Sequence, residues 1–182
     1  MRLLDDFRRL DRRLTHRVAS WDSAGARQAL PAVGSAAEGT KLWWGTALVM
    51  TVVGGRSERK AAAAGVVSML SSQLIANAVC KQLYARRRPP GELIPHDGVE
   101  DRPDSSSFPS GHTAAAVGFT AAVAASHPWW GAAAAVPTTL VAFERVHSGA
   151  HYPSDVAVGA VIGLTTAFLV HRAPRLLLRA AL

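Results

Sequence analysis

One apolar block without a charged side chain, AAAAGVVSMLSSQLIANAVC at 61–80, constrains this chain most strongly. A helix needs about 20 residues to cross the hydrocarbon core of a bilayer, and this block reaches that length. Further apolar blocks lie at 42–55, 113–143 and 156–170, and SHPWWG at 126–131 divides the long one into two. The pattern predicts an all-α fold, an integral membrane helical bundle with about five transmembrane helices. A soluble bundle of buried helices is the alternative.

The first 21 residues are predicted to form a basic amphipathic helix, because apolar side chains recur at helical spacing among arginines. The apolar stripe consists of Leu3, Phe7, Leu10, Leu14, Val18 and Trp21. Such a helix can lie in the membrane interface or pack its stripe on the protein's own body, and the sequence leaves both open. We therefore divide the chain into an N-terminal amphipathic, interfacial region at 1–40, a transmembrane core at 41–173 and a basic tail at 174–182.

The charge balance indicates an anionic partner. The chain has 20 Lys and Arg against 13 Asp and Glu, a formal net charge of +7. Nucleic acid, acidic lipid or a phosphate ester would all suit that charge. Because the arginines border apolar segments and no zinc-finger or RNA-binding pattern is present, we expect membrane lipids and no nucleic acid as partners.

The predicted helices place several polar residues at one end of the bundle. With up-and-down topology, the helix ends at Lys81, His112, Arg145 and near Asp155 share one face. Tryptophans commonly form belts at membrane interfaces. Four tryptophans are expected in such belts: Trp43, Trp44, Trp129 and Trp130.

Three stretches at that face contain residues suited to phosphoryl chemistry. They are KQLYARRRP at 81–89, PSGH at 109–112 and RVHSGAHYPSD at 145–155. Lysine and arginine neutralise and bind phosphate oxygens, and a helix N-terminus adds backbone N–H groups. The stretches therefore predict a phosphate site. Arg86 and Arg87 are expected to be membrane anchors instead of phosphate ligands.

The histidines complete the chemistry. Asp155 follows His151 by one helical turn, so its carboxylate can hold one imidazole nitrogen protonated and leave the other to attack phosphorus. His112 can donate a proton to the leaving oxygen. Phosphoryl transfer needs charge stabilisation, an in-line nucleophile and an acid, so we expect no metal ion or other cofactor. The alternatives are inert interfacial histidines and, for Asp155, a helix cap.

At these residues the chain resembles the type 2 phosphatidic acid phosphatase superfamily. Its pattern is Lys-x6-Arg-Pro, then Pro-Ser-Gly-His, then Ser-Arg-x5-His-x3-Asp, and the chain matches it in order and spacing. The resemblance covers 42–171. It implies a phosphohistidine intermediate on His151, activated by Asp155, with His112 as the acid. The phosphate ligands that it implies are Lys81, Arg88, Ser110, Gly111 and Arg145.

Glu144 departs from the pattern, because the family usually has serine at this position. A carboxylate that faced a phosphate would repel it. We therefore expect Glu144 to turn away from the site or to contact another cation.

The resemblance implies a membrane phosphatase that hydrolyses the phosphate monoester or diphosphate of a lipid. A polyprenyl-linked cell-envelope precursor, such as a polyprenyl phosphosugar phosphate, is the favoured substrate. Phosphatidate, phosphatidylglycerol phosphate and undecaprenyl diphosphate are alternatives, and the selecting residues are expected within 90–107 and along the helix faces. More remote alternatives are a vanadate-dependent haloperoxidase, which shares the motifs, and an inactive membrane interaction protein.

Composition and charge also predict a location. Abundant arginine and alanine hint at a bacterial source, and therefore at the bacterial cell membrane. Lysine and arginine favour the cytoplasmic side of a membrane, and they are concentrated at the motif end in 8–17, at Lys41 and in 81–88. The opposite end has fewer, in the turn at 56–60 and after 171. We therefore expect the active site to face the cytoplasm.

Overall fold

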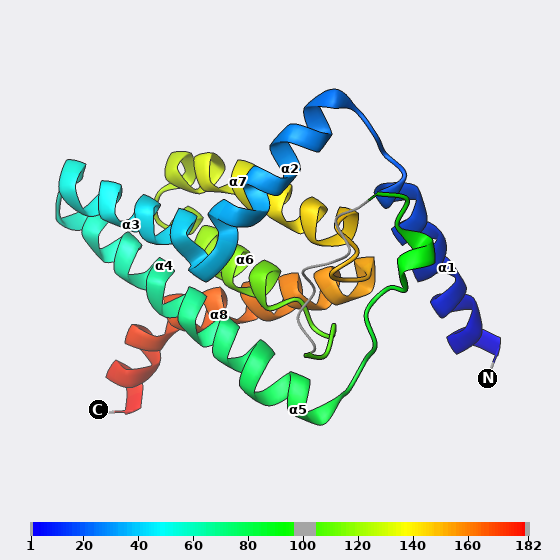
Figure 1. Cartoon of the computed structure of the whole chain (residues 1–182). Helices are drawn as coiled ribbons and strands as arrows, with labels where there is room; N and C mark the ends of the chain where they lie inside the picture. The colour runs from blue at the N-terminus through cyan, green and yellow to red at the C-terminus, as the bar shows by residue number, and fades with distance from the viewer. Residues whose placement is uncertain (1, 97–104, 181–182) are drawn as a thin grey trace.

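Every regular element in the part of the chain that the computed structural model describes, residues 2–96 and 105–180, is helical (Figure 1). The longer helices are α1 (Arg2–Ala19), α2 (Ala24–Ala37), α3 (Lys41–Val53), α4 (Arg56–Leu74), α6 (Gly111–Ala124), α7 (Pro128–His147) and α8 (Pro153–Ala180). From α3 onward the long helices run back and forth, and α6 contacts α4, α7 and α8. The predicted all-α bundle is confirmed.

The uncharged block at 61–80 lies within one nearly continuous helix. This helix begins as α4, passes through a π-helical turn at Ile75–Cys80 and ends as α5 (Lys81–Leu83). Among the described residues, Arg56–Leu83 and Pro153–Ala173 are the two helices long and apolar enough to cross a membrane. The number of five spans stays a prediction, as does the division of the chain into three regions.

Glycines let α6 lie close to its neighbours. A Cβ atom at Gly163 of α8 would stand 2.7 Å from both the Ala114 oxygen and the Gly118 nitrogen of α6. At Gly65 of α4 it would stand 2.9 Å from the Phe119 ring. Close backbone packing of this kind stabilises helix pairs in lipid, where the hydrophobic effect does not drive association between helices.

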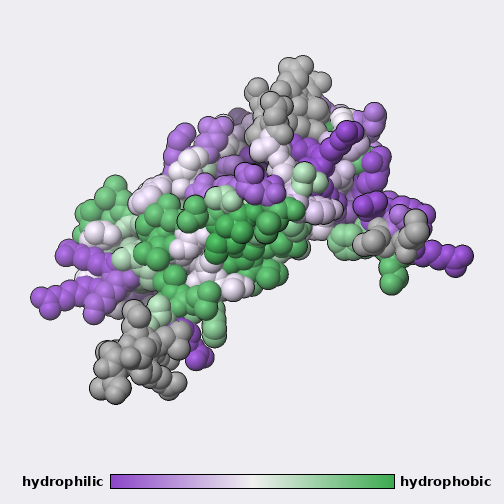
Figure 2. Space-filling model, turned by 90° about the horizontal axis from the view of Figure 1, so that it is seen from below, coloured by the Kyte–Doolittle hydropathy of each residue, from purple (hydrophilic) through white to green (hydrophobic). Residues whose placement is uncertain are grey.

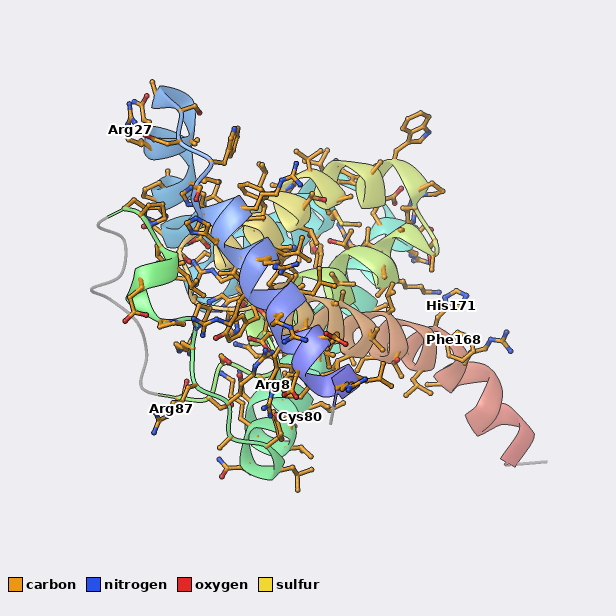
Figure 3. All side chains as sticks on the ribbon, turned by 90° about the vertical axis from the view of Figure 1, so that its right-hand side faces the viewer. Arg8, Arg27, Cys80, Arg87, Phe168 and His171 are labelled. Atoms are coloured by element: carbon orange, nitrogen blue, oxygen red, sulfur yellow. The ribbon has the colours of Figure 1, made fainter. Side chains whose placement is uncertain are left out.

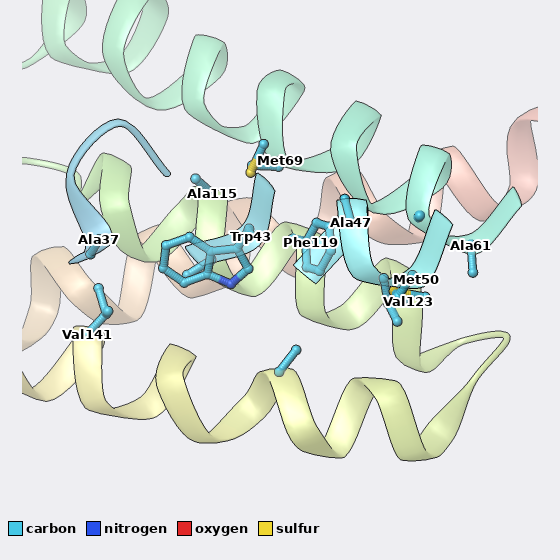
Figure 4. Close-up of a cluster of buried hydrophobic side chains, with 13 residues drawn as sticks. Ala37, Trp43, Ala47, Met50, Ala61, Met69, Ala115, Phe119, Val123 and Val141 are labelled. Carbon is cyan, nitrogen blue, oxygen red and sulfur yellow. The ribbon is translucent and has the colours of Figure 1, made fainter. Parts of the chain in front are cut away.

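The buried core corrects one prediction about tryptophan. Trp43 is 1% exposed and lies among Met50, Met69 and Phe119 (Figure 4). Its indole N–H donates to the Thr138 hydroxyl at 3.3 Å, which satisfies the polar end of the ring inside the bundle. The prediction that Trp43 belongs to an interfacial belt is therefore wrong, because a partner on α7 replaces the water that an interface would supply.

Large apolar side chains cover the outside of the bundle. Figure 2 shows them as a broad band between polar ends. Exposed large apolar side chains on α3, α4 and α8 include Leu48, Val52, Val67, Leu70, Leu74, Val161, Leu164 and Phe168. A continuous apolar surface of this kind is rare on soluble monomers and is suited to lipid, which separates this fold from a soluble bundle.

Helix α1 packs against the body with its polar side. Asp11 and Thr15 are buried on that side, whereas the apolar residues Leu3, Phe7 and Leu10 are each more than half exposed. The sequence left two arrangements open. The structure does not show the one in which the apolar stripe packs on the body. The outward stripe fits a helix that lies in the membrane interface.

Candidate active site

The motif-bearing helix ends meet around a hollow of about 360 Å³. Its lining consists of Gln73, Asn77, Lys81, Arg88, Ser105, Gly111, His112, Arg145, Ala150 and His151. All the predicted site residues except Ser110 and Asp155 therefore line one cavity. The cations come from three separate segments of the chain, so the fold concentrates positive charge that is dispersed in the sequence.

A π-helical turn shapes one wall of this hollow. The turn at Ile75–Cys80 carries Asn77 toward the first residue of α6. A Cβ atom at Gly111 would lie 2.6 Å from the Asn77 amide oxygen, so the close approach requires glycine there. Asn77 and Gln73 were missed by the sequence analysis, because uncharged polar residues in an apolar helix have no distinctive spacing. π turns of this type frequently occur at functional sites.

Hydrogen bonds fix two of the cations. The Arg88 guanidinium donates to the Ala150 carbonyl at 2.6 Å and to the Ser105 hydroxyl at 3.3 Å. The Arg145 Nε donates to the Glu144 carboxylate. Both guanidinium groups thus reach the hollow from anchored positions, which reduces the entropy lost when an anion binds.

Glu144 contacts a cation, as expected, but the cation is the site residue Arg145 itself. The Glu144 side chain is 7% exposed, and α2 covers this pair. A Cβ atom at Gly34 would stand 3.1 Å from an Arg145 terminal nitrogen and 3.2 Å from Glu144 Oε1. The carboxylate therefore restrains Arg145 from the side of α2.

His151 is 3% exposed and has a fixed orientation. Its Nδ1 donates to the Ser107 carbonyl at 2.6 Å, which leaves Nε2 for the hollow. Asp155 Oδ2 stands 3.9 Å from the same Nδ1, so the predicted carboxylate is close, but the direct acceptor is a backbone oxygen. Burial, and then the positive charge of Arg88, hold the pKa of His151 well below its ordinary value. The ring is therefore neutral and able to act as a nucleophile at neutral pH.

Asp155 is fully buried behind His151 and has two further partners. Its Oδ2 accepts the Tyr152 N–H at 2.9 Å, and this bond caps the first turn of α8. Its Oδ1 accepts a hydrogen bond from Arg86 at 2.5 Å. Asp155 therefore caps α8, which was the alternative prediction, and also lies beside His151.

Arg86 lies inside the protein, so its predicted position as a membrane anchor is wrong. One terminal nitrogen donates to Asp155, and the other donates to Asp11 of α1 at 2.6 Å. The guanidinium also stacks 4.1 Å above the Tyr152 ring centroid. Arg87, by contrast, is exposed and extends away from the body in Figure 3. The sequence could not separate these adjacent arginines, since their difference depends on a carboxylate 75 residues away.

Ser110 caps a helix and does not line the hollow. Its hydroxyl accepts the Thr113 N–H, and its own N–H donates to the Asp155 carbonyl at 3.0 Å. These bonds align the first turn of α6, which bears Gly111 and His112, with the first turn of α8. Among the described residues, no group of three His, Cys, Asp or Glu side chains is arranged to hold a metal ion.

Comparison with known sequences identifies relatives. The PAP2 superfamily profile matches residues 61–179. The chain is 32% identical over 133 residues to decaprenylphosphoryl-5-phosphoribose phosphatase of Mycobacterium tuberculosis, across 70% of this chain and 69% of that protein. It is 30% identical over 97 residues to undecaprenyl-diphosphatase of Sulfolobus acidocaldarius, across 53% of this chain. That match spans about half, 47%, of the Sulfolobus protein.

Two solved structures have the same fold. LpxE of Aquifex aeolicus superimposes with a TM-score of 0.70 at 21% identity, over 88% of this chain and 93% of that one. A transmembrane PAP2-type phosphatidylglycerolphosphate phosphatase of Bacillus subtilis superimposes with a TM-score of 0.69 at 20% identity, over 93% and 87%. The predicted membrane bundle therefore has solved counterparts.

Proposed function

The chain belongs to the PAP2 superfamily, and on that premise we propose that it is a membrane phosphatase that removes the terminal phosphate of a polyprenyl-linked phosphosugar. The observation that carries the proposal is the hollow in which Lys81, Arg88 and Arg145 surround the free face of a buried, oriented histidine. The names of the curated relatives support a hydrolase that acts on phosphate esters.

The first chemical step forms a phosphoenzyme. The three cations bind the phosphate oxygens, together with the N–H group of Gly111 at the start of α6. Ser110, predicted as a further phosphate ligand, instead caps this helix, and its own N–H donates to the Asp155 carbonyl. Nε2 of His151 attacks phosphorus, so an N–P bond forms while the P–O bond to the sugar breaks. His112, protonated once the phosphate dianion offsets the positive charge of the three cations, gives its proton to the departing oxygen. Ser107 and Asp155 hold the proton and the developing charge on Nδ1 of His151.

The second step returns the enzyme to its starting state. His112, now neutral, takes a proton from water as the water oxygen attacks phosphorus. The N–P bond of His151 breaks, and inorganic phosphate leaves. Lysine and arginine neutralise the phosphoryl oxygens throughout, so the reaction needs no metal ion.

The phosphosugar is favoured by the Mycobacterium relative, whose name specifies a decaprenylphosphoryl phosphoribose. A lipid diphosphate is the second candidate, because the Sulfolobus relative is an undecaprenyl-diphosphatase. Both substrates place a phosphate at the membrane surface beside a polyprenyl chain. Of the segment expected to select between them, 90–107, residues 97–104 lie outside the described part of the chain.

A substrate panel tests the proposal. Purified protein in detergent is given polyprenylphosphoryl 5-phosphoribose, undecaprenyl diphosphate, phosphatidate and phosphatidylglycerol phosphate, and released phosphate is measured with and without EDTA. His151→Ala serves as the inactive control. We expect the highest kcat/KM for the phosphosugar lipid. Faster hydrolysis of any of the other three would overturn the substrate assignment, and no phosphate release at all would overturn the activity.

We place the active site on the cytoplasmic side of a bacterial cell membrane, on the basis of the lysine and arginine distribution. Single cysteines in a Cys80→Ser background test this. Glu92 is exposed at the active-site end, and Ser126 is exposed in the turn at the other end (Figure 1). In intact cells, a membrane-impermeant maleimide should label Ser126→Cys and should label Glu92→Cys only after lysis. The reverse pattern would refute the orientation.

A further inference from the structure

A second hollow of about 530 Å³ lies beside the phosphate hollow. It is bounded by the junction of α1 and α2, by α2 itself, by the segment after Gly91–Leu93 and by the end of α7. The lining residues that bear on its chemistry are Trp21, Asp22, Ala26, Leu30, Glu144 and His147. A volume of several hundred Å³ is typical of pockets that bind small ligands.

Consecutive residues of α7 line the two hollows. Glu144 lines the second hollow, Arg145 lines the phosphate hollow, and their side chains are bonded to each other. Glu144 Oε2 accepts from Arg145, so Oε1 is the oxygen left for other donors. A ligand whose phosphate contacts Arg145 would extend past this carboxylate into the second hollow.

The lining of the second hollow is suited to a neutral, hydroxylated group. A hydrocarbon tail would cover the Glu144 carboxylate without offering it a hydrogen bond, which is costly for a charge that is only 7% exposed. A second phosphate would be repelled by this carboxylate. Arg27 also lines the second hollow, but its guanidinium already makes two bonds of 2.6 Å to Asp22. Hydroxyl groups, in contrast, donate to carboxylates, and the C–H face of a sugar ring can pack on the apolar wall at Ala26 and Leu30.

We propose that the second hollow is a sugar subsite, and that Glu144 is a specificity-determining residue that accepts hydrogen bonds from the hydroxyls of a pentose or hexose ring. This inference rests on the proposed phosphatase function and adds to it the group next to the scissile phosphate. It also gives a reason for glutamate where the family pattern has serine. The longer carboxylate reaches the second hollow while it holds Arg145.

The test compares two substrates that share a phosphate monoester but differ in the sugar: polyprenylphosphoryl 5-phosphoribose and phosphatidate. Ala26→Phe places a ring in the second hollow, and Ala29→Phe places the same ring on the exposed side of the same helix as a matched control. Glu144→Gln keeps the size of the side chain and removes its charge. The readout is the ratio of kcat/KM for the two substrates, and gel filtration in detergent confirms that each variant is folded.

We expect Ala26→Phe and Glu144→Gln each to lower this ratio by about 10-fold or more, since hydrogen bonds to charged groups are worth about that factor. Ala29→Phe should leave the ratio unchanged. If Glu144 acts only by restraining Arg145, Glu144→Gln will change both substrates equally, and the subsite assignment fails. If Ala26→Phe fails to fold, Ala26→Leu provides the smaller obstruction. A wild-type protein that hydrolyses phosphatidate but not the phosphosugar lipid would instead overturn the proposed function itself.

Discussion

Substitution of Arg86 by glutamine should impair catalysis although Arg86 does not line the phosphate hollow. Arg86 contacts Asp155 at 2.5 Å and Asp11 at 2.6 Å, and these side chains are 0% and 4% exposed. Glutamine can keep one hydrogen bond, but it cannot neutralise two buried carboxylates. Asp155 would then lose the charge that fixes it beside His151, and Asp11 of α1 would keep its hydrogen bonds from Ser154 but lose its cation.

The size of the effect follows from burial. Removal of one partner of a buried ion pair costs about 3–5 kcal/mol, because the other charge stays uncompensated. Part of this cost reduces the stability of the fold, and part raises the reaction barrier. Roughly 1.4 kcal/mol corresponds to a factor of ten in rate. If half of the lower cost, about 3 kcal/mol, raises the barrier, kcat falls about 10-fold. If all of it does, kcat falls about 100-fold.

The assay is steady-state hydrolysis by purified variants, with Arg87→Gln as the matched control. Arg87 is adjacent to Arg86 and exposed, and its substitution by glutamine removes the same charge. For Arg86→Gln we expect kcat to fall 10- to 100-fold with KM within about threefold of wild type, because the residue does not touch the bound phosphate. Asp11→Asn should be non-additive with Arg86→Gln, since the two share one network. A kcat equal to that of Arg87→Gln would refute the reasoning.

Three further outcomes are expected. His151→Ala should lower phosphate release by several orders of magnitude while the folded protein still elutes as a single species, and retention of a tenth of the activity would exclude His151 as nucleophile. Excess EDTA should leave the rate unchanged and orthovanadate should inhibit, as measured by released phosphate; strict dependence on Mg²⁺ would contradict this. Because the pKa of His151 is depressed, the ring stays neutral as pH falls through 6.5. The acid limb of kcat/KM should therefore lie below that value, and a limb above it would argue against this nucleophile.

The sequence predicted those residues of the site whose separations along the chain match helix geometry. His151 and Asp155 are one helical turn apart, and Lys81 and Arg88 flank a helix end, so their positions relative to apolar blocks indicated one face of a bundle. The spacing could not reveal that the Ser107 carbonyl accepts the hydrogen bond from Nδ1 of His151, because every residue has a carbonyl. Nor could it reveal the π turn that aims Asn77 into the hollow.

The sequence predicted the parts of the fold that depend on long apolar blocks. It predicted less well the parts that depend on single contacts. Trp43 was misplaced because an indole suits an interface and a core equally, and only the Thr138 hydroxyl on a distant helix decides between them. The direction in which α1 faces was open for a similar reason. Its apolar stripe is evident in the sequence, but Asp11 is held inward by Arg86 and by Ser154, whose N–H and hydroxyl both donate to it.

Charge balance explains how one end of an apolar helix bundle can contain so many ionised groups. Around the phosphate hollow, Lys81, Arg88 and Arg145 face one carboxylate, Glu144, so the group has two positive charges in excess, which match a phosphate dianion. Behind His151, the carboxylates of Asp11 and Asp155 face one cation, Arg86, which leaves one negative charge in excess. In the proposed mechanism, that charge lies where the imidazole becomes positive as Nε2 bonds to phosphorus. On the proposed mechanism, this arrangement of charges complements the reacting state more closely than the empty site. The electrostatic cost of holding the charges together would then be recovered when a lipid phosphate binds and reacts.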